Sequence, residues 1–292
     1  MYKIFMEFDN PTEEYLGQKT SVQGFAVHEK LGFVLFHKGI CAIYDLKTKN
    51  RKPLGVFKIG SFNDGVPDAR YPNHANDAMF GAIIEGEDYP LLYVTAGNSG
   101  ESDEKGYISY CAVEQIRYEN GSFSAQTVQR IYYKNDGIEK TQYQTPGWGW
   151  PASLVEVKNG WYYMFSARYR TKKEFYRSDN VYIVTKFRLP NPKNGDVTLY
   201  PLDIVEQFEL PFNVFITQGG TIYDEKIWYT FGFGKEEYPN ALRVIDLKTH
   251  KYVMLEDLSK EPFYDDEIEC CAFFENQLLI NTHGGKIYVK IS

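Results

Sequence analysis

The strongest constraint on the fold is a phrase that the chain contains twice. VQGFAVHEKLGFVLFHKG, residues 22–39, returns as TQGGTIYDEKIWYTFGFG, residues 217–234. Each copy is followed at nearly the same distance by one further phrase, AIYDLKTKN at 42–50 and RVIDLKTHK at 243–251. A repeat that keeps its internal spacing across such a separation indicates one supersecondary unit that the fold uses more than once.

Within each copy, short apolar runs alternate with polar residues and end at turn signals, which is the pattern of antiparallel strands. The pattern predicts five such units, at approximately 22–60, 74–133, 147–208, 217–256 and 268–292. A unit of three or four strands cannot bury both of its faces alone, but a ring of such units buries them all. The sequence therefore predicts an all-β fold, a five-bladed β-propeller.

The fifth unit has only three strands before the chain stops, and the N-terminal run YKIFMEF, residues 2–8, belongs to no unit of its own. We expect residues 2–8 to complete the last blade, because a closed ring leaves no free sheet edge there. No linker or low-complexity tract interrupts the chain, so 1–292 is interpreted as a single β-propeller domain. The only weak helical candidates are SAQTVQRI at 124–131 and EKTQYQ at 139–144.

The composition agrees with an all-β protein and excludes some partners. Aromatic residues make up 16%, with 24 Tyr and 20 Phe, and both types favour strands. A net charge of −7 argues against nucleic-acid binding. No apolar run is long enough to span a bilayer. We expect a cytoplasmic protein as the sequence is written, or a periplasmic or surface lipoprotein if a leader was removed. No cofactor is predicted.

Four cysteines, Cys41, Cys111, Cys270 and Cys271, form no CxxC pair. We expect them to be reduced and buried as small apolar side chains. Neighbours in a strand point to opposite faces, so Cys270 and Cys271 should enter different interblade cores.

Several phrases together resemble a known family. QG with IYDLKTK, HAND with YPLLYVT, and TQGG with FGFG and IDLKT are similar to phrases of a bacterial five-bladed propeller family found in gut anaerobes. The family motif His-x-Asn-Asn is here His74-Ala75-Asn76-Asp77, so a role for the second Asn does not transfer. The resemblance implies the propeller fold and no activity. A looser similarity links the QG and DLKT phrases to plant-type glutaminyl cyclases, which are also propellers.

Aligning the units places one polar residue of each at the start of its innermost strand. These residues are Gln23, the pair Asn76 and Asp77 with His74 nearby, Gln218 and Glu269, with Trp150 or Ala152 at the third position. Innermost strands surround the central channel, so their first residues should meet at one mouth of it. The aligned glutamines also have a purely structural interpretation, in which they bond only loop backbone and water.

The functional hypothesis is a polar pocket at this mouth with Trp148 and Trp150 as aromatic walls, which suits a small carbohydrate-like ligand. Arg168 follows an apolar strand and is a candidate for a bidentate contact to a ligand carboxylate. A glycoside-active enzyme, hydrolase or lyase, that uses Asp77 and Glu269 is one alternative. A protein-interaction platform is another, and no catalytic residue is assigned. A metal would need ligands from several blades, with His74, Asp77 and Glu269 the candidates, and none is predicted.

Overall fold

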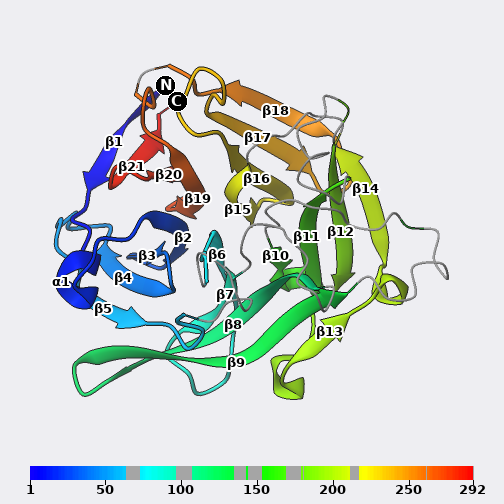
Figure 1. Ribbon diagram of the computed structural model, residues 1–292, viewed down its shortest axis with the longest axis horizontal. Coiled ribbons are helices and arrows are strands. Elements are labelled where there is room, and N and C mark those ends of the chain that lie inside the picture. Colours follow the sequence, from blue (N-terminus) through cyan, green and yellow to red (C-terminus); the bar gives the residue numbers. More distant parts are fainter. Residues whose placement is uncertain are drawn as a thin grey trace.

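The computed structural model describes residues 1–63, 73–96, 107–134, 143, 153–168, 179, 181–210, 217–260 and 262–291. Five small sheets surround one axis, and the two chain ends lie side by side at the rim (Figure 1). The predicted five-bladed β-propeller closed by the N-terminal strand is therefore confirmed. Among the described residues, no helix has the length and apolarity required to cross a membrane.

Each blade begins with its innermost strand, and chain order continues outward. The first blade contains β2 (Val22–His28), β3 (Leu31–Phe36), β4 (Ile40–Asp45) and β5 (Gly55–Lys58). The second contains β6 (Asp77–Ile83), β7 (Pro90–Thr95), β8 (Tyr107–Glu119) and β9 (Ser122–Lys134). The third contains β10 (Ser153–Glu156), β11 (Trp161–Ala167), β12 (Tyr182–Arg188) and β14 (Glu206–Leu210).

The last two blades differ in how they are completed. The fourth contains β15 (Thr217–Tyr223), β16 (Lys226–Phe231), β17 (Ala241–Asp246) and β18 (Tyr252–Asp257). The fifth contains β19 (Ile268–Phe274), β20 (Gln277–Thr282) and β21 (Lys286–Lys290), with β1 (Tyr2–Glu7) as its outermost strand. Register pairs Tyr2 with Lys290 and Glu7 with Lys286, so the first and last strands of the chain form one ladder.

Two local features of the strands were not predicted. The segment SAQTVQRI lies within strand β9 rather than in a helix, because cross-strand pairing with β8 overrides a weak helical preference. A short strand, β13 (Val197–Leu199), leaves the third blade and pairs in parallel with β9, which gives the second blade a fifth strand.

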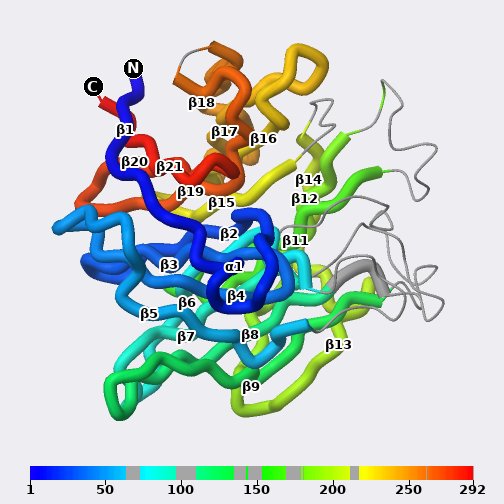
Figure 2. The backbone as a smooth tube through the Cα atoms, turned by 60° about the vertical axis from the view of Figure 1, so that its left-hand side comes forward, coloured from blue at the N-terminus to red at the C-terminus, as the bar shows by residue number. Residues whose placement is uncertain are grey.

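Helical structure is confined to connections. Helix α1 (Thr12–Leu16) lies between β1 and β2 (Figure 2), and 3-10 turns occupy η2 (Val157–Asn159), η3 (Pro192–Asn194) and η4 (Pro201–Asp203). Pro11 precedes α1, and Gly17 ends it in the left-handed conformation with φ of 75°.

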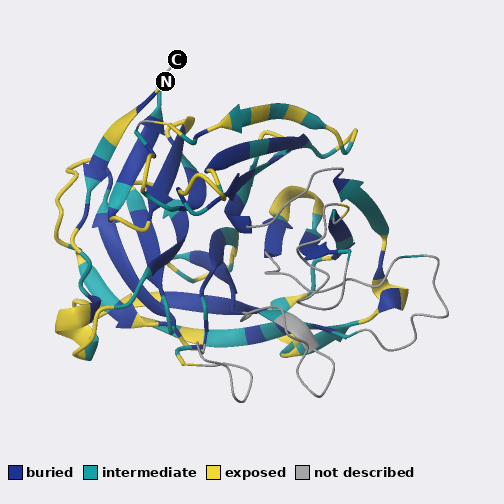
Figure 3. Cartoon of the chain, turned by 45° about the horizontal axis from the view of Figure 1, so that its top comes forward, coloured by how far each residue is buried: buried dark blue, intermediate teal, exposed yellow. Residues whose placement is uncertain are grey.

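Apolar side chains on the sheet faces form the cores between blades, so the strands around the axis are largely buried while many turns are exposed (Figure 3). Phe33 and Leu92 meet between the first and second blades, and Phe25 and Leu279 between the fifth and first. A fully buried Phe or Leu stabilises such a core by about 1.5–3 kcal/mol.

All four cysteines are free and buried. Cys270 packs in the core between the fifth and first blades, whereas Cys271 packs in the core between the fourth and fifth. The two adjacent thiols therefore face opposite sides of β19, as the strand pattern predicted.

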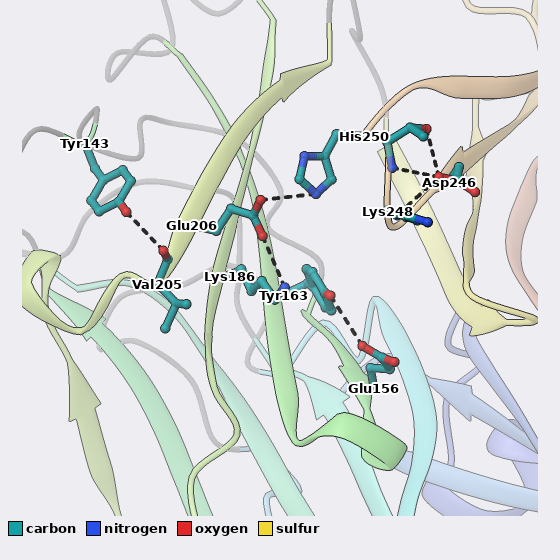
Figure 4. A network of polar contacts seen from close by, with 10 residues as sticks. Tyr143, Glu156, Tyr163, Lys186, Val205, Glu206, Asp246, Lys248 and His250 are labelled. Atoms are coloured by element: carbon teal, nitrogen blue, oxygen red, sulfur yellow. Dashed lines mark hydrogen bonds and ion pairs between the residues drawn. The ribbon is translucent and has the colours of Figure 1, made fainter.

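Polar contacts also join blades. Within the third blade, Glu206 accepts from Lys186 at 3.1 Å, and it contacts the fourth blade through Nε2 of His250 at 3.4 Å (Figure 4). The His250 ring stacks on Phe208 with ring centroids 4.1 Å apart. His250 belongs to the turn that follows the second DLKT phrase, so this repeated turn also contacts the neighbouring blade.

Candidate functional site at the channel mouth

The repeated Gln-Gly corner is a β-bulge. In β2 the register moves from Val22–Phe36 to Phe25–Val34, which leaves one extra residue around Gln23. The same shift occurs in β15, where Thr217 pairs with Phe231 and Gly220 with Tyr229. In β19 the extra residue is Glu269, between the pairs Ile268–Thr282 and Cys270–Asn281. A bulge turns a side chain away from the regular alternation, and here it does so at the same end of three innermost strands.

The glycines of these corners permit close approach at the axis. A Cβ on Gly24 would lie 2.9 Å from the backbone oxygen of Ala75, to which the Gly24 amide also donates at 2.9 Å. A Cβ on Gly219 would lie 2.6 Å from Sγ of Cys270 and 2.8 Å from Oδ1 of Asp77. No other residue fits without displacing a neighbouring blade, which explains why the phrase is Gln-Gly in both copies.

Asp77, the first residue of β6, joins three blades at the axis. Its Oδ1 accepts from the Ala78 amide at 2.9 Å, from the Gly220 amide at 3.1 Å and from the Cys270 thiol at 3.2 Å. Gly220 belongs to the fourth blade and Cys270 to the fifth. Burial raises the pKa of Asp77 to about 7, while these three donors act in the opposite direction. Asp77 therefore links the second, fourth and fifth blades by hydrogen bonds at the axis.

Gln218 connects the fourth and fifth blades. Its Nε2 donates to the backbone oxygen of Gly232 at 3.0 Å and to Oε1 of Glu267 at 2.8 Å. Asn76 joins this group from the second blade, with Nδ2 3.5 Å from the Gln218 backbone oxygen. Burial raises the pKa of Glu267, and the bond from Gln218 lowers it in part. The predicted residues Asn76, Asp77 and Gln218 are thus brought together around one end of the channel.

Three residues of the ring keep a buried oxygen without a hydrogen-bond partner: Glu269 and Gln23 at Oε1, and Asp77 at Oδ2. Glu269 is 1% exposed and Gln23 5% exposed, and neither Oε1 of Glu269 nor Oε1 of Gln23 has a partner. Burial raises the pKa of Glu269 well above its usual range, and repulsion from Glu267 and Asp266 adds to the rise. Asp77 is not among the causes of this rise, and Glu269 is not among the causes of the raised pKa of Asp77. Buried acceptors of this kind are rare in folded proteins and indicate a missing donor.

Histidines stand beside this ring. The rings of His37 and His74 lie with centroids 4.3 Å apart. Burial lowers the pKa of His37 to about 4, with His283 and Lys38 adding to the shift, and burial lowers the pKa of His74 well below its usual value. His37 and His74 are therefore neutral at physiological pH and add no positive charge to the mouth.

A cavity of about 650 Å³ opens on the same face beside the mouth. It lies between the connection that carries α1 and the fifth and first blades. Val22, directly before Gln23, lines it together with His283, and its charged lining is mixed, with Lys19 and Arg51 beside Asp9 and Glu13. A ligand at the mouth could therefore extend into an adjoining hollow.

Of the other predicted site residues, Arg168 forms an ion pair within the third blade and three lie outside the described residues. Arg168 follows β11 at the mouth face, but its Nη2 pairs with Oε2 of Glu209 at 2.7 Å on the outermost strand β14. Its contact with a ligand stays a prediction. Trp148, Trp150 and Ala152 lie outside the described residues. No group of three or more His, Cys, Asp or Glu in the described ranges could hold a metal ion.

The structure adds residues that the sequence reasoning missed. Glu267 and Asn281 belong to the ring, since Asn281 donates to the Gln23 backbone oxygen at 2.9 Å and accepts from the Cys270 amide at 2.8 Å. His37 and His283 occupy equivalent turns between the second and third strands of the first and fifth units. The phrases FHKG and THGG carried that signal, since each places a histidine after an apolar strand and before a glycine.

Comparisons with known proteins find no family for this chain and only distant structural likenesses. No family model and no curated protein sequence matches the chain. Among solved structures, it is similar to a glutaminyl cyclase of Myxococcus xanthus, with 12% identity, a TM-score of 0.49, and coverage of 99% of this chain and 94% of that one. It is also similar to Raptor of Chaetomium thermophilum, with 13% identity, a TM-score of 0.42, and coverage of 98% and 20%.

A third similar structure is the hydrazine synthase of Kuenenia stuttgartiensis, with 13% identity, a TM-score of 0.39, and coverage of 91% and 63% of the two chains. The likeness to a glutaminyl cyclase is loose, as the repeated phrases indicated. At such identities and TM-scores, none of these proteins indicates what this chain binds.

Proposed function

We propose that the protein binds a small polar, carbohydrate-like ligand at the mouth formed by the bulged corners of its innermost strands. The observation that supports this most is the pair of buried acceptors without partners, Oε1 of Gln23 and Oε1 of Glu269. An unpartnered buried acceptor costs about 1–3 kcal/mol, which a ligand hydroxyl would recover by donating to it.

The surroundings suit such a ligand. Amides and carboxylates from four blades surround the mouth, and the cavity of about 650 Å³ beside it is of a size that can take a sugar unit. Asp77 and Gln218 hold the ring in position through contacts between blades. A rigid polar ring next to a cavity is a common arrangement for recognising several hydroxyls at once.

A glycosidase that uses Asp77 and Glu269 is a weaker proposal. Oδ1 of Asp77 already accepts from three donors at the axis, so only its other oxygen is available for proton transfer. The interaction platform is the remaining alternative, and it would bind proteins over a broad face instead of small ligands at the axis.

The test is a panel of mono- and oligosaccharides titrated by calorimetry and by tryptophan fluorescence, with products followed by chromatography. We expect at least one saccharide to bind without turnover. Turnover would support the glycosidase, and a flat response across the panel would contradict the proposed function.

The matched variant is Gln218→Ala. It removes the donor to Glu267 and should weaken binding by about 1–3 kcal/mol with little change in the melting temperature. The control is Gln277→Ala, since Gln277 is exposed in the turn that begins β20, at the opposite end of its blade. Equal affinities for both variants would place the ligand away from Gln218.

A further inference from the structure

Two side-chain amides and one hydroxyl of the mouth already donate to acceptors within the protein. The side-chain nitrogen Nε2 of Gln218 donates to the backbone oxygen of Gly232 and to the carboxylate of Glu267. The side-chain nitrogen Nδ2 of Asn281 donates to the Gln23 backbone oxygen. The Thr230 hydroxyl is 2.6 Å from the Gly219 backbone oxygen and 3.2 Å from that of Glu269. The buried atoms left over are oxygens: Oε1 of Gln23, Oε1 of Glu269 and Oδ2 of Asp77. A complementary ligand therefore has to supply donors.

The charges around Glu269 point to a cation as that donor. Glu267 and Asp266 lie on the segment just before β19, and both repel the ionised form of Glu269. Opposing them, Lys286 is 3.7 Å from Oδ2 of Asp266, and His283 and Lys235 act on Glu267. Neither these two lysines nor His283 is among the causes that shift the pKa of Glu269.

The groups packed nearby do not neutralise Glu269 either. Burial keeps His37 and His74 neutral, and Lys38 acts on His37. Asp77 bonds Cys270 and Gly220 at the axis. A buried carboxylate that lacks a counter-ion is costly, and pairing with a positive group removes most of that cost.

We propose that the ligand at the mouth carries a protonated amine, as an amino sugar does, with Glu269 as its counter-ion and Gln23 accepting a second hydrogen bond; this rests on the function proposed above. An ammonium group offers three donors and no acceptor, which matches a mouth whose unpartnered buried atoms are the oxygens of Gln23, Glu269 and Asp77. The neutral hydroxyls of the same ligand would extend toward the adjoining cavity lined by Val22 and His283.

Calorimetry on the full chain can separate this inference from the proposed function. The probes are glucose, galactose and mannose, each compared with its 2-amino and N-acetylamino forms, at about pH 6 where the amine is protonated. We expect an amino form to bind about tenfold or more tightly than its hydroxyl and N-acetyl counterparts. Glu269→Gln should remove this preference. Glu225→Gln, in the exposed turn at the far end of the fourth blade, should keep it.

Each outcome bears on a different one of these proposals. A neutral hexose that binds as tightly as its amino form overturns the amine inference and leaves the proposed function standing. No binding by any form overturns the proposed function. An amine preference that survives in Glu269→Gln overturns the assignment of Glu269.

A second measurement needs no variant. Because the Glu269 carboxyl holds its proton when buried without a cation, amine binding should release a proton, and neutral sugars should release none. Titrations in two buffers with different ionisation enthalpies measure this release. Amine binding without proton release, or with proton uptake, would contradict the counter-ion role of Glu269.

Discussion

The two ends of the repeated unit contain equally polar residues but use them differently. At the DLKT end, Asp45 accepts from the amides of Lys47 and Thr48 at 2.8 and 3.1 Å. Asp246 accepts from the amide and hydroxyl of Thr249 at 2.7 and 2.8 Å. At the Gln-Gly end, Gln23 and the equivalent Glu269 keep buried oxygens without partners.

The difference indicates two reasons for one repeat. The DLKT turn satisfies its own backbone locally, so it returns wherever the same turn is needed. The Gln-Gly bulge returns because only glycine fits beside the axis, and the polar residue before it is turned toward the mouth. The self-contained end serves folding, and the incompletely bonded end is where we propose that a ligand binds.

Removing the ring closure should have the largest effect, because both ends depend on an intact ring. Deletion of residues 1–8 removes β1, with buried Met6 and Phe8 and the bond from Tyr2 to Glu256 at 2.9 Å. The melting temperature should fall by more than about 10 °C, with loss of cooperative unfolding. Ile4→Thr, on an exposed position of the same strand, should change it by about 2 °C at most. A truncated protein with unchanged melting would show that β1 does not close the ring.

The second-largest effect should come from Asp77, which links three blades at the mouth end. The pKa of Asp77 is raised to about 7, so protonation stabilises the fold, and this stabilisation is complete below about pH 4 and lost as pH rises through 7. Asp77→Asn should match the wild type at low pH and exceed its stability by a few kcal/mol above pH 7.

Urea unfolding at several pH values measures this difference. Glu267, Glu269 and Glu114 also have raised pKa values, but they are common to both proteins and cancel in the comparison. A stability difference that does not change with pH would contradict the buried, protonated state of Asp77.

The tight packing of the bulge can be tested with Gly219→Ala. The added Cβ would overlap Cys270 Sγ and Asp77 Oδ1, so the free energy of unfolding should fall by about 1–3 kcal/mol. The double variant with Cys270→Ala removes the nearest atom and should recover part of the loss, which a double-mutant cycle measures. Additive losses would show that the Cys270 contact does not set the glycine requirement.

These two ends also show what sequence can predict. The strands, the five units and the closure by residues 2–8 followed from periodicity and spacing, because each depends on local alternation and turns. The ring of Asn76, Asp77 and Gln218 followed from aligning the units. Glu267 and Asn281 did not follow, because they reach the mouth only through contacts between blades that single-unit alignment cannot show.

The sequence also could not show which contacts Asp77 and Arg168 make with other strands and blades. Asp77 was expected to face a ligand, yet its Oδ1 is taken by groups from the fourth and fifth blades, more than one hundred residues away in the chain. Arg168 was placed correctly at the end of an apolar strand, but its pairing with Glu209 depends on a strand order that the sequence does not contain.

The smallest effect should come from the turn end. Asp246→Ala removes the acceptor for Thr249 and Lys248, but the turn keeps the backbone bond from His250 to Asp246 at 2.9 Å (Figure 4). The melting temperature should fall by only about 1–3 °C, because the freed amides are exposed and water replaces the lost acceptor.

Ligand affinity should stay the same, because Asp246 lies at the opposite end of its blade from Gln218. Asp45→Ala, the matched change in the first copy, should behave alike by differential scanning calorimetry and titration. If either turn variant weakens binding as much as Gln218→Ala does, the separation between a structural end and a binding end is wrong.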